Sequence, residues 1–193
     1  MSGLRETKKA ATRSALSRAA AQLALTEGPE SLTVATIAAE AGFSTRTFHN
    51  YFASREEALV EFMSSQIRNL IAQLEELPAD LDTQDALEHL VINHFRKGDS
   101  ELDSFSALYQ VGEILEKLGP PPCAFDANIM LEPLRLFFKH KMPQLDDFEI
   151  DVSIHLQAAA IAAALKWYYR NPEPRDPEMA IGLVKRASGL LKR

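Results

Sequence analysis

The sequence predicts an all-α fold of about nine helices. Alanine supplies 27 of the 193 residues and leucine 25, whereas valine supplies only six, so helix formers far outnumber strand formers. Apolar residues recur at intervals of three and four, and glycine, proline or capping residues separate the resulting segments. With 46% hydrophobic residues, the chain can bury a substantial core.

The first quarter of the chain predicts three helices. Residues 12–27 carry an apolar face at helical spacing, and Gly28-Pro29 ends that pattern. Thr33 is an N-cap for a short helix over 34–40, and Ser44 is an N-cap for another over 45–51. We therefore expect two short helices joined by a tight turn.

A long helix is predicted to follow. Ser54 with Glu57 forms a capping-box pattern, and an apolar stripe continues to Pro78. Further helices are predicted at 83–97, 100–118, 124–141, 146–170 and 176–192, with Gly112 as a candidate break in the second of these. We expect one domain over 1–53 and another over 54–193, bridged by the long helix, with residues 79–82 as a hinge.

Several classes of protein are disfavoured by composition. A single cysteine permits no internal disulfide, and the longest apolar run is too short to span a bilayer, so we expect a cytoplasmic protein. The sequence has no phosphate-binding glycine loop or nucleophile motif, and its histidines lack metal-ligand spacing. We predict no enzyme activity, no cofactor, no metal and no membrane partner.

Charge is distributed unevenly. Residues 1–52 carry a net charge of +2, whereas the remainder carries −8. A basic end on an acidic protein suits local contact with a polyanion, although +2 is also within ordinary variation. The basic residues before the first apolar face either reach DNA or form a solvated, frayed terminus; they are Arg5, Lys8, Lys9 and Arg13.

The two short helices carry helix-turn-helix spacing. Counted from Val34, alanine stands fifth (Ala38), glycine ninth (Gly42) and a large apolar residue fifteenth (Phe48). The alanine permits close helix approach, the glycine permits the turn, and the aromatic ring seals the core. The same spacing also occurs by chance in alanine-rich helical proteins.

The outer face of the second short helix favours DNA binding. No acidic residue occurs from Phe43 to Arg55, so the face offers donors without repelling phosphate. Arg46 suits bidentate recognition of guanine, and Asn50 suits adenine. The predicted contacts on this segment are Thr45, Arg46, Thr47, His49 and Asn50.

The stretch from Thr33 to Leu59, together with the helix before it, resembles the N-terminal signature of TetR-family regulators. The resemblance covers residues 12–63 and departs from the commonest pattern at Phe43, His49 and Arg55. It implies additional DNA contacts by Thr33, Tyr51 and Arg55, with Arg55 retaining the charge usual at that position. Tyr51 is alternatively a structural aromatic residue.

The same resemblance implies a homodimer built on the last two helices. Small and apolar residues in these helices predict close packing against a second copy, or alternatively an intramolecular core. The predicted interface residues are Ile154, Ala158, Ile161, Leu165, Leu183, Val184 and Ala187.

The second domain is expected to sense a small molecule. Aromatic residues there predict an effector pocket, although most such residues only fill a core. The candidates are Phe105, Tyr109, Phe125, Phe138 and Trp167. We therefore predict a regulator, most simply a repressor released from a palindromic operator by an effector. The alternative is a chromosome-organising or protein-docking factor that binds DNA but no small molecule.

Overall fold

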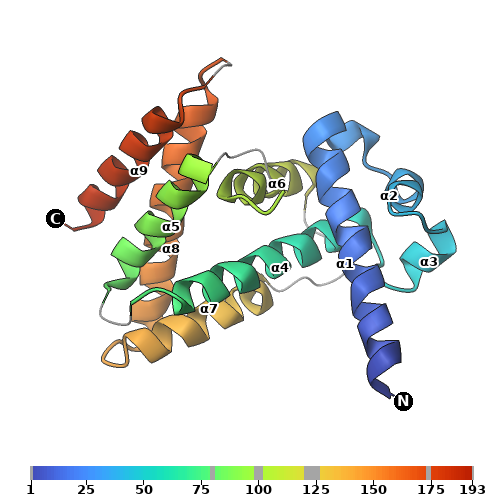
Figure 1. The fold of residues 1–193 in the computed structure, drawn as a ribbon, viewed down its shortest axis with the longest axis horizontal. Helices are drawn as coiled ribbons and strands as arrows, with labels where there is room; N and C mark the ends of the chain where they lie inside the picture. Colours follow the sequence, from blue (N-terminus) through green and yellow to red (C-terminus); the bar gives the residue numbers. More distant parts are fainter. Residues whose placement is uncertain (1, 79–80, 98–101, 120–126, 173–174, 193) are drawn as a thin grey trace. The chain divides into compact units, whose positions relative to one another are not determined.

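The computed structural model describes residues 2–78, 81–97, 102–119, 127–172 and 175–192, and its regular structure in these ranges is entirely helical. The predicted all-α fold is confirmed. The α-helices, shown in Figure 1, are α1 (Ser2–Glu27), α2 (Val34–Glu40), α3 (Thr45–His49), α4 (Arg55–Glu75), α5 (Thr83–Lys97), α6 (Phe105–Leu118), α7 (Ala127–Lys141), α8 (Asp147–Tyr169) and α9 (Pro177–Leu191). A 3₁₀ turn, Pro29–Ser31, follows α1.

The helix α1 begins ten residues earlier than predicted. Its first turns are exposed and therefore carry no core-facing apolar pattern for the sequence to reveal. The Thr7 hydroxyl donates to the Gly3 carbonyl at 2.8 Å, and the Thr12 hydroxyl donates to the Lys8 carbonyl at 3.1 Å. The expectation of a frayed terminus is therefore wrong over residues 2–12.

The helix α6 runs without a break through Gly112, against the break considered at that position. A β-carbon at Gly112 would lie 3.6 Å from the terminal methyl group of Met63, an ordinary packing distance.

Two compact units make up the chain. One comprises residues 1–66 with 110–130, and the other comprises residues 67–109 with 131–193. The division falls within α4, between Gln66 and Ile67, rather than before this helix at residue 53. Both α4 and α6 contribute residues to each unit.

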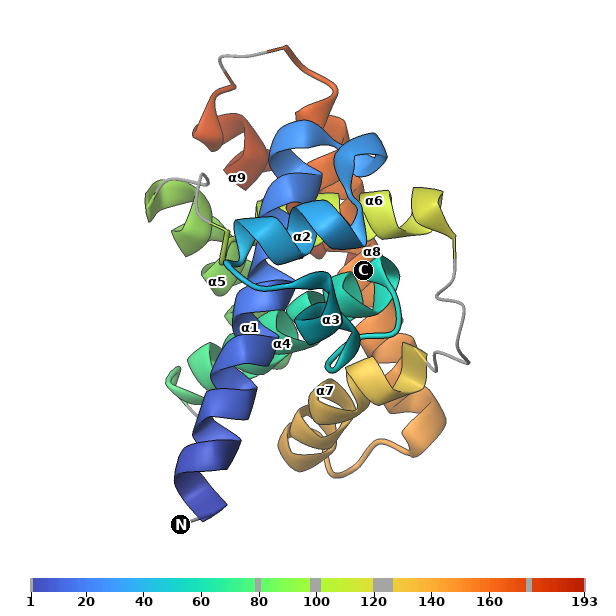
Figure 2. The ribbon, with the colours of Figure 1, turned by 90° about the vertical axis from the view of Figure 1, so that its right-hand side faces the viewer.

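The first unit buries the inner faces of its N-terminal helices. Figure 2 shows α2 beside α1 and α3 beside α2, and these helix pairs are in contact. Fully buried side chains come from every element of this group and from the first half of α4; the largest are Leu16, Leu32, Ile37, Phe48, Phe52, Leu59 and Phe62. The short α2 and α3 are thus held by a shared core.

The second unit contains two apolar clusters. The Phe138 cluster joins α4, α5, α7 and α8 and comprises Leu74, Ala86, Leu87, Leu90, Phe137, Phe138, Ile150 and Ile154. The Tyr168 cluster joins α5, α8 and α9 and comprises Val91, Ile92, Phe95, Ala164, Leu165, Tyr168, Ala180, Ile181 and Val184. Figure 1 shows α8 and α9 side by side, and each of α5 and α8 packs against α9.

Three of the predicted dimer residues belong to these clusters. Ile154 is 3% exposed in the Phe138 cluster, while Leu165 and Val184 are 2% and 1% exposed in the Tyr168 cluster. Their side chains are already buried within one chain, which leaves them almost no surface for the predicted dimer contact. Ala158 is exposed, and Ile161, Leu183 and Ala187 are half-buried.

The helix α8 is apolar over much of its circumference. Among the described helices, α8 is the one that is long and apolar enough to span a membrane, judged by length and composition alone. Its inner face contributes to both clusters of the second unit, as a helix of a folded domain does. Only 28% of its most apolar window is buried, so a large apolar surface faces outward.

Candidate nucleic-acid interface

Local hydrogen bonds fix the two short helices and the turn between them. Thr33 and Thr36 form a reciprocal capping box at the start of α2. Gly42 has φ +74°, a conformation that other residues rarely adopt, and the Phe43 amide donates to the Ala38 carbonyl at 2.7 Å to close the turn. Ser44 then accepts from the Thr47 amide at 3.1 Å and caps α3.

The inner side of this motif is a small apolar core. Phe48, Ile37 and Ala38 are all at most 1% exposed. The ring of Phe48 lies 5.6 Å from that of Phe52. The three positions singled out by spacing, Ala38, Gly42 and Phe48, therefore have the packing and turn roles expected of them.

The outer side of α3 exposes polar side chains. Thr45, Arg46, His49 and Asn50 are exposed, and Thr47 is half-buried. The first turn of α3 has no acidic residue, and no described side chain pairs with the Arg46 guanidinium. The predicted contact residues on this segment thus share one surface free of carboxylates.

Arg13 holds α3 and α4 to α1. Its Nε donates to Glu61 Oε2 at 2.7 Å, its Nη1 donates to the Tyr51 carbonyl at 2.8 Å, and its guanidinium lies 4.4 Å from the centroid of the Phe52 ring. Arg13 therefore stabilises the fold, whereas Arg5, Lys8 and Lys9 stay exposed along α1. Sequence reasoning missed this role because the partners lie 38 and 48 residues away.

Arg55 has partners inside the same unit. Its Nη1 donates to the Leu32 carbonyl at 2.6 Å and its Nε donates to Glu56 at 2.9 Å. Burial would raise the pKa of the Glu56 carboxyl, but hydrogen bonds from Arg55, the backbone and Ser54, with the Arg55 charge, outweigh it and lower the pKa. The Arg55 side chain, which is predicted to contact phosphate, thus also stabilises the motif.

The start of α4 is capped almost as predicted. The Glu57 amide donates to the Ser54 hydroxyl at 3.2 Å. The Glu57 carboxylate accepts from the Ala53 amide at 2.6 Å, one residue earlier than a standard capping box.

The predicted effector residues separate into three groups. Phe105 and Tyr109 are half-buried; Tyr109 stacks on Tyr169 with centroids 6.1 Å apart. Phe138 is fully buried in the cluster named after it. Trp167 is 56% exposed and lies under the Arg170 guanidinium, so it lacks the enclosed setting of the other described candidates. Phe125 lies outside the described residues.

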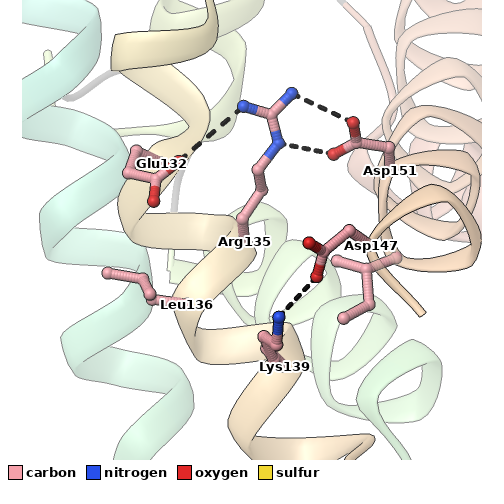
Figure 3. Close-up of a pocket in the computed structure, with 7 residues that line it drawn as sticks. Glu132, Arg135, Leu136, Lys139, Asp147 and Asp151 are labelled. Atoms are coloured by element: carbon pink, nitrogen blue, oxygen red, sulfur yellow. Dashed lines mark hydrogen bonds and ion pairs between the residues drawn. The ribbon is translucent and has the colours of Figure 1, made fainter. Parts of the chain in front are cut away.

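A hollow of about 270 Å³ lies between α7 and α8 (Figure 3), lined by Glu132, Arg135, Leu136, Lys139, Asp147, Ile150 and Asp151. Arg135 donates to both carboxylate oxygens of Asp151, and Lys139 pairs with Asp147. The hydrogen bond and opposite charges of Lys139 and Asp147 lower the pKa of Asp147 and raise that of Lys139. The paired charges in this hollow link α7 to α8. The hollow has no aromatic lining residue among those described, so it does not resemble the predicted aromatic pocket. The described residues contain no group of three metal-ligating side chains.

A short helix, a glycine turn and a second helix with an exposed, carboxylate-free face form a helix-turn-helix motif, an arrangement that many DNA-binding proteins use. Residues 16–62 match the profile of the bacterial regulatory proteins of the tetR family. This match covers the same N-terminal residues whose resemblance to TetR-family regulators was noted from the sequence.

Individual known proteins are similar to larger parts of the chain. The HTH-type transcriptional regulator TcmR of Streptomyces glaucescens is 35% identical over 102 residues, which make up 51% of this chain. The chain spans 45% of the length of that relative. Among solved structures, the fatty acid degradation regulator FadR of Bacillus halodurans superposes with a TM-score of 0.60, and FadR of Thermus thermophilus, a transcriptional repressor in complex with lauroyl-CoA, with 0.58. Both are 21% identical and are matched over 93% of each chain, so they support the fold.

Proposed function

We propose that this protein is a cytoplasmic, homodimeric repressor that binds a palindromic operator through α3 and is released by a small-molecule effector. The observation that carries the DNA-binding part is the exposed, carboxylate-free face of α3. Arg46 and Asn50 have the donors to read guanine and adenine, and the hydroxyls of Thr45 and Thr47 suit phosphate.

Around α3, further residues extend the proposed DNA surface. Thr33 and His49 are exposed, and Tyr51 is half-buried next to the Arg13 anchor. Thr33 is also the N-cap of α2, so its hydroxyl has a structural role as well. We propose that these residues and Arg55 contact phosphates or sugars beside the groove that α3 occupies.

The dimer contact is proposed on the outer α8 face, which comprises Phe148, Val152, Leu156, Ala159, Ala163 and Trp167. These residues recur every three or four positions and share one side of the helix. Four are large and between 39% and 75% exposed, and the exposed Ala159 and Ala163 between them permit close approach of a second helix. Of the interface residues predicted from sequence on this helix, Ala158 is the one that is exposed, although it lies outside this face.

A two-fold pair of such chains would present two copies of α3 to successive major grooves, about 34 Å apart. An effector that binds more tightly to another arrangement of the dimer would lower operator affinity by the difference in binding free energy. Continuity of α4 across both compact units supports this coupling.

Selection of bound fragments from genomic DNA, followed by anisotropy titration at several salt concentrations, tests the proposal. We expect the bound fragments to share an inverted repeat and the affinity to fall steeply with salt. Bound sites without two-fold symmetry would contradict the dimeric operator. Absence of salt-sensitive affinity for any duplex would contradict DNA binding itself.

A further inference from the structure

One buried amide in the second unit has an unpaired end. Gln157 lies on the inner side of α8 and is 8% exposed. Its Nε2 donates to the Ser153 hydroxyl at 3.0 Å, but no described residue donates to its Oε1. If the amide oxygen and nitrogen exchanged places, the nitrogen would instead be the buried atom without a hydrogen-bond partner.

An unpaired buried carbonyl destabilises a fold, so its presence calls for a reason. Gln157 follows Ile154, which belongs to the Phe138 cluster, by three positions and precedes Ile161, which packs on the Tyr168 cluster, by four. These positions share a helix face, so the amide lies on α8 where the two clusters adjoin. An apolar residue would suit this place better than glutamine if packing were its purpose.

Aromatic side chains line the same junction. Phe105 packs against both clusters and is half-buried, and the His94 ring meets its edge with centroids 5.2 Å apart. Tyr109 packs on the Tyr168 cluster and is also half-buried. Partly covered rings packed on the two clusters that adjoin at the unpaired acceptor suit a ligand with an apolar body and one hydrogen-bond donor.

We propose that Gln157 Oε1 is the polar anchor of the effector site, and that the effector is an aromatic-sized apolar molecule whose hydroxyl donates to it. The proposal rests on the sensing role proposed above and adds the chemical class of the ligand. A buried water on the carbonyl is the competing explanation, since water would also satisfy the acceptor.

Thermal unfolding of the ligand-free, full-length protein separates these explanations. Gln157→Met removes the unpaired acceptor, and we expect the Tm to rise by about 2–4 °C. Gln66→Met is the matched control, because Gln66 is 6% exposed and has a partner; its Tm should fall. A fall in Tm for Gln157→Met would overturn the proposal, since the amide would then already be satisfied.

A pair of probes tests the ligand class. 4-Butylphenol carries a hydroxyl donor, and 4-butylanisole differs by a methyl group in place of the donated hydrogen. At ten times its Kd, the phenol should raise the Tm of the wild type by about 3–6 °C. The wild type should bind the phenol about tenfold more tightly than the anisole, whereas the Gln157→Met variant should bind both probes with equal affinity.

Equal responses of the wild type to the two probes, including no response to either, would overturn the anchor. Duplex affinity measured on the same samples keeps the two proposals apart. A protein that binds its operator but does not discriminate between the probes refutes the anchor alone, and a protein that discriminates but binds no duplex refutes the operator proposal alone.

Discussion

The outer faces of α3 and α8 are both exposed in a single chain, and both differ from an ordinary solvated surface. The α3 face is polar but has no carboxylate, whereas the outer α8 face has large apolar side chains separated by alanines. A surface without acids suits a polyanion, and a surface without charge suits another apolar surface. The residue types that are absent from each face thus indicate the chemistry of the partner that the face suits.

The largest effect is expected from a charge on the outer α8 face. Leu156→Asp should raise the Kd of dimerisation by more than about 100-fold, because an unpaired carboxylate would be buried in an apolar contact. The monomer should stay folded, since Leu156 is 52% exposed. Sedimentation equilibrium measures the association.

Leu4→Asp provides the control, since Leu4 is 70% exposed on α1, in the other compact unit. Its dimerisation should match that of the wild type. If Leu156→Asp also left the association unchanged, the dimer contact would lie elsewhere.

A smaller effect is expected on the α3 face. Arg46→Ala should lose about 5–150-fold in affinity for the selected operator while binding unrelated duplexes almost as before, because it removes a base contact. Tyr51→Phe should weaken binding to all duplexes alike, because it removes a backbone contact. Anisotropy titrations against operator and scrambled duplexes measure both.

Arg96→Ala is the matched control, since Arg96 is exposed on α5 in the second unit. It should leave both affinities unchanged. Equal loss of base preference in the Arg46 and Tyr51 variants would contradict the separate roles given to these residues.

The smallest effect concerns what supports each face. In the unit that carries α3, hydrogen bonds and ion pairs of Arg13 and Arg55 supplement the apolar core. Because the pKa of Glu56 is lowered in the fold, its contribution is present above the ordinary glutamate pKa and is lost as the pH falls through the lowered value. Glu56→Gln should therefore lose about 1 kcal/mol near neutral pH and less in acid.

Urea unfolding at neutral pH and below the ordinary glutamate pKa measures this difference. Glu40→Gln is a control, since Glu40 is exposed at the end of α2. A Glu56→Gln deficit that grew in acid would have the wrong sign and would exclude a stabilising carboxylate.

The motif that carries α3 was predictable because local chemistry determines it. Thr33, Gly42 and Ser44 act within three to five residues of themselves, as caps and a turn. A single sequence reveals interactions of this range. The Arg13 anchor was not predictable, because it depends on partners brought close only by folding.

The faces of α8 were less predictable. Alanine occurs on every side of this helix, so its periodicity does not distinguish the buried side from the exposed one. Ile154 and Leu165 were therefore assigned to a partner although they fill the core of one chain. Trp167 was assigned to a pocket for a similar reason, since aromatic composition does not indicate which way a ring points.

The unpaired side-chain carbonyl of Gln157 has a consequence for engineering and adaptation. Under the role proposed for it, variants screened for heat resistance would gain by replacing it with methionine or leucine. Such variants would keep their operator affinity but no longer respond to inducer, and the controlled genes would stay silent. Under the proposed function, thermal selection on this protein would then yield super-repressors, and we expect their first substitutions relative to the wild type at position 157.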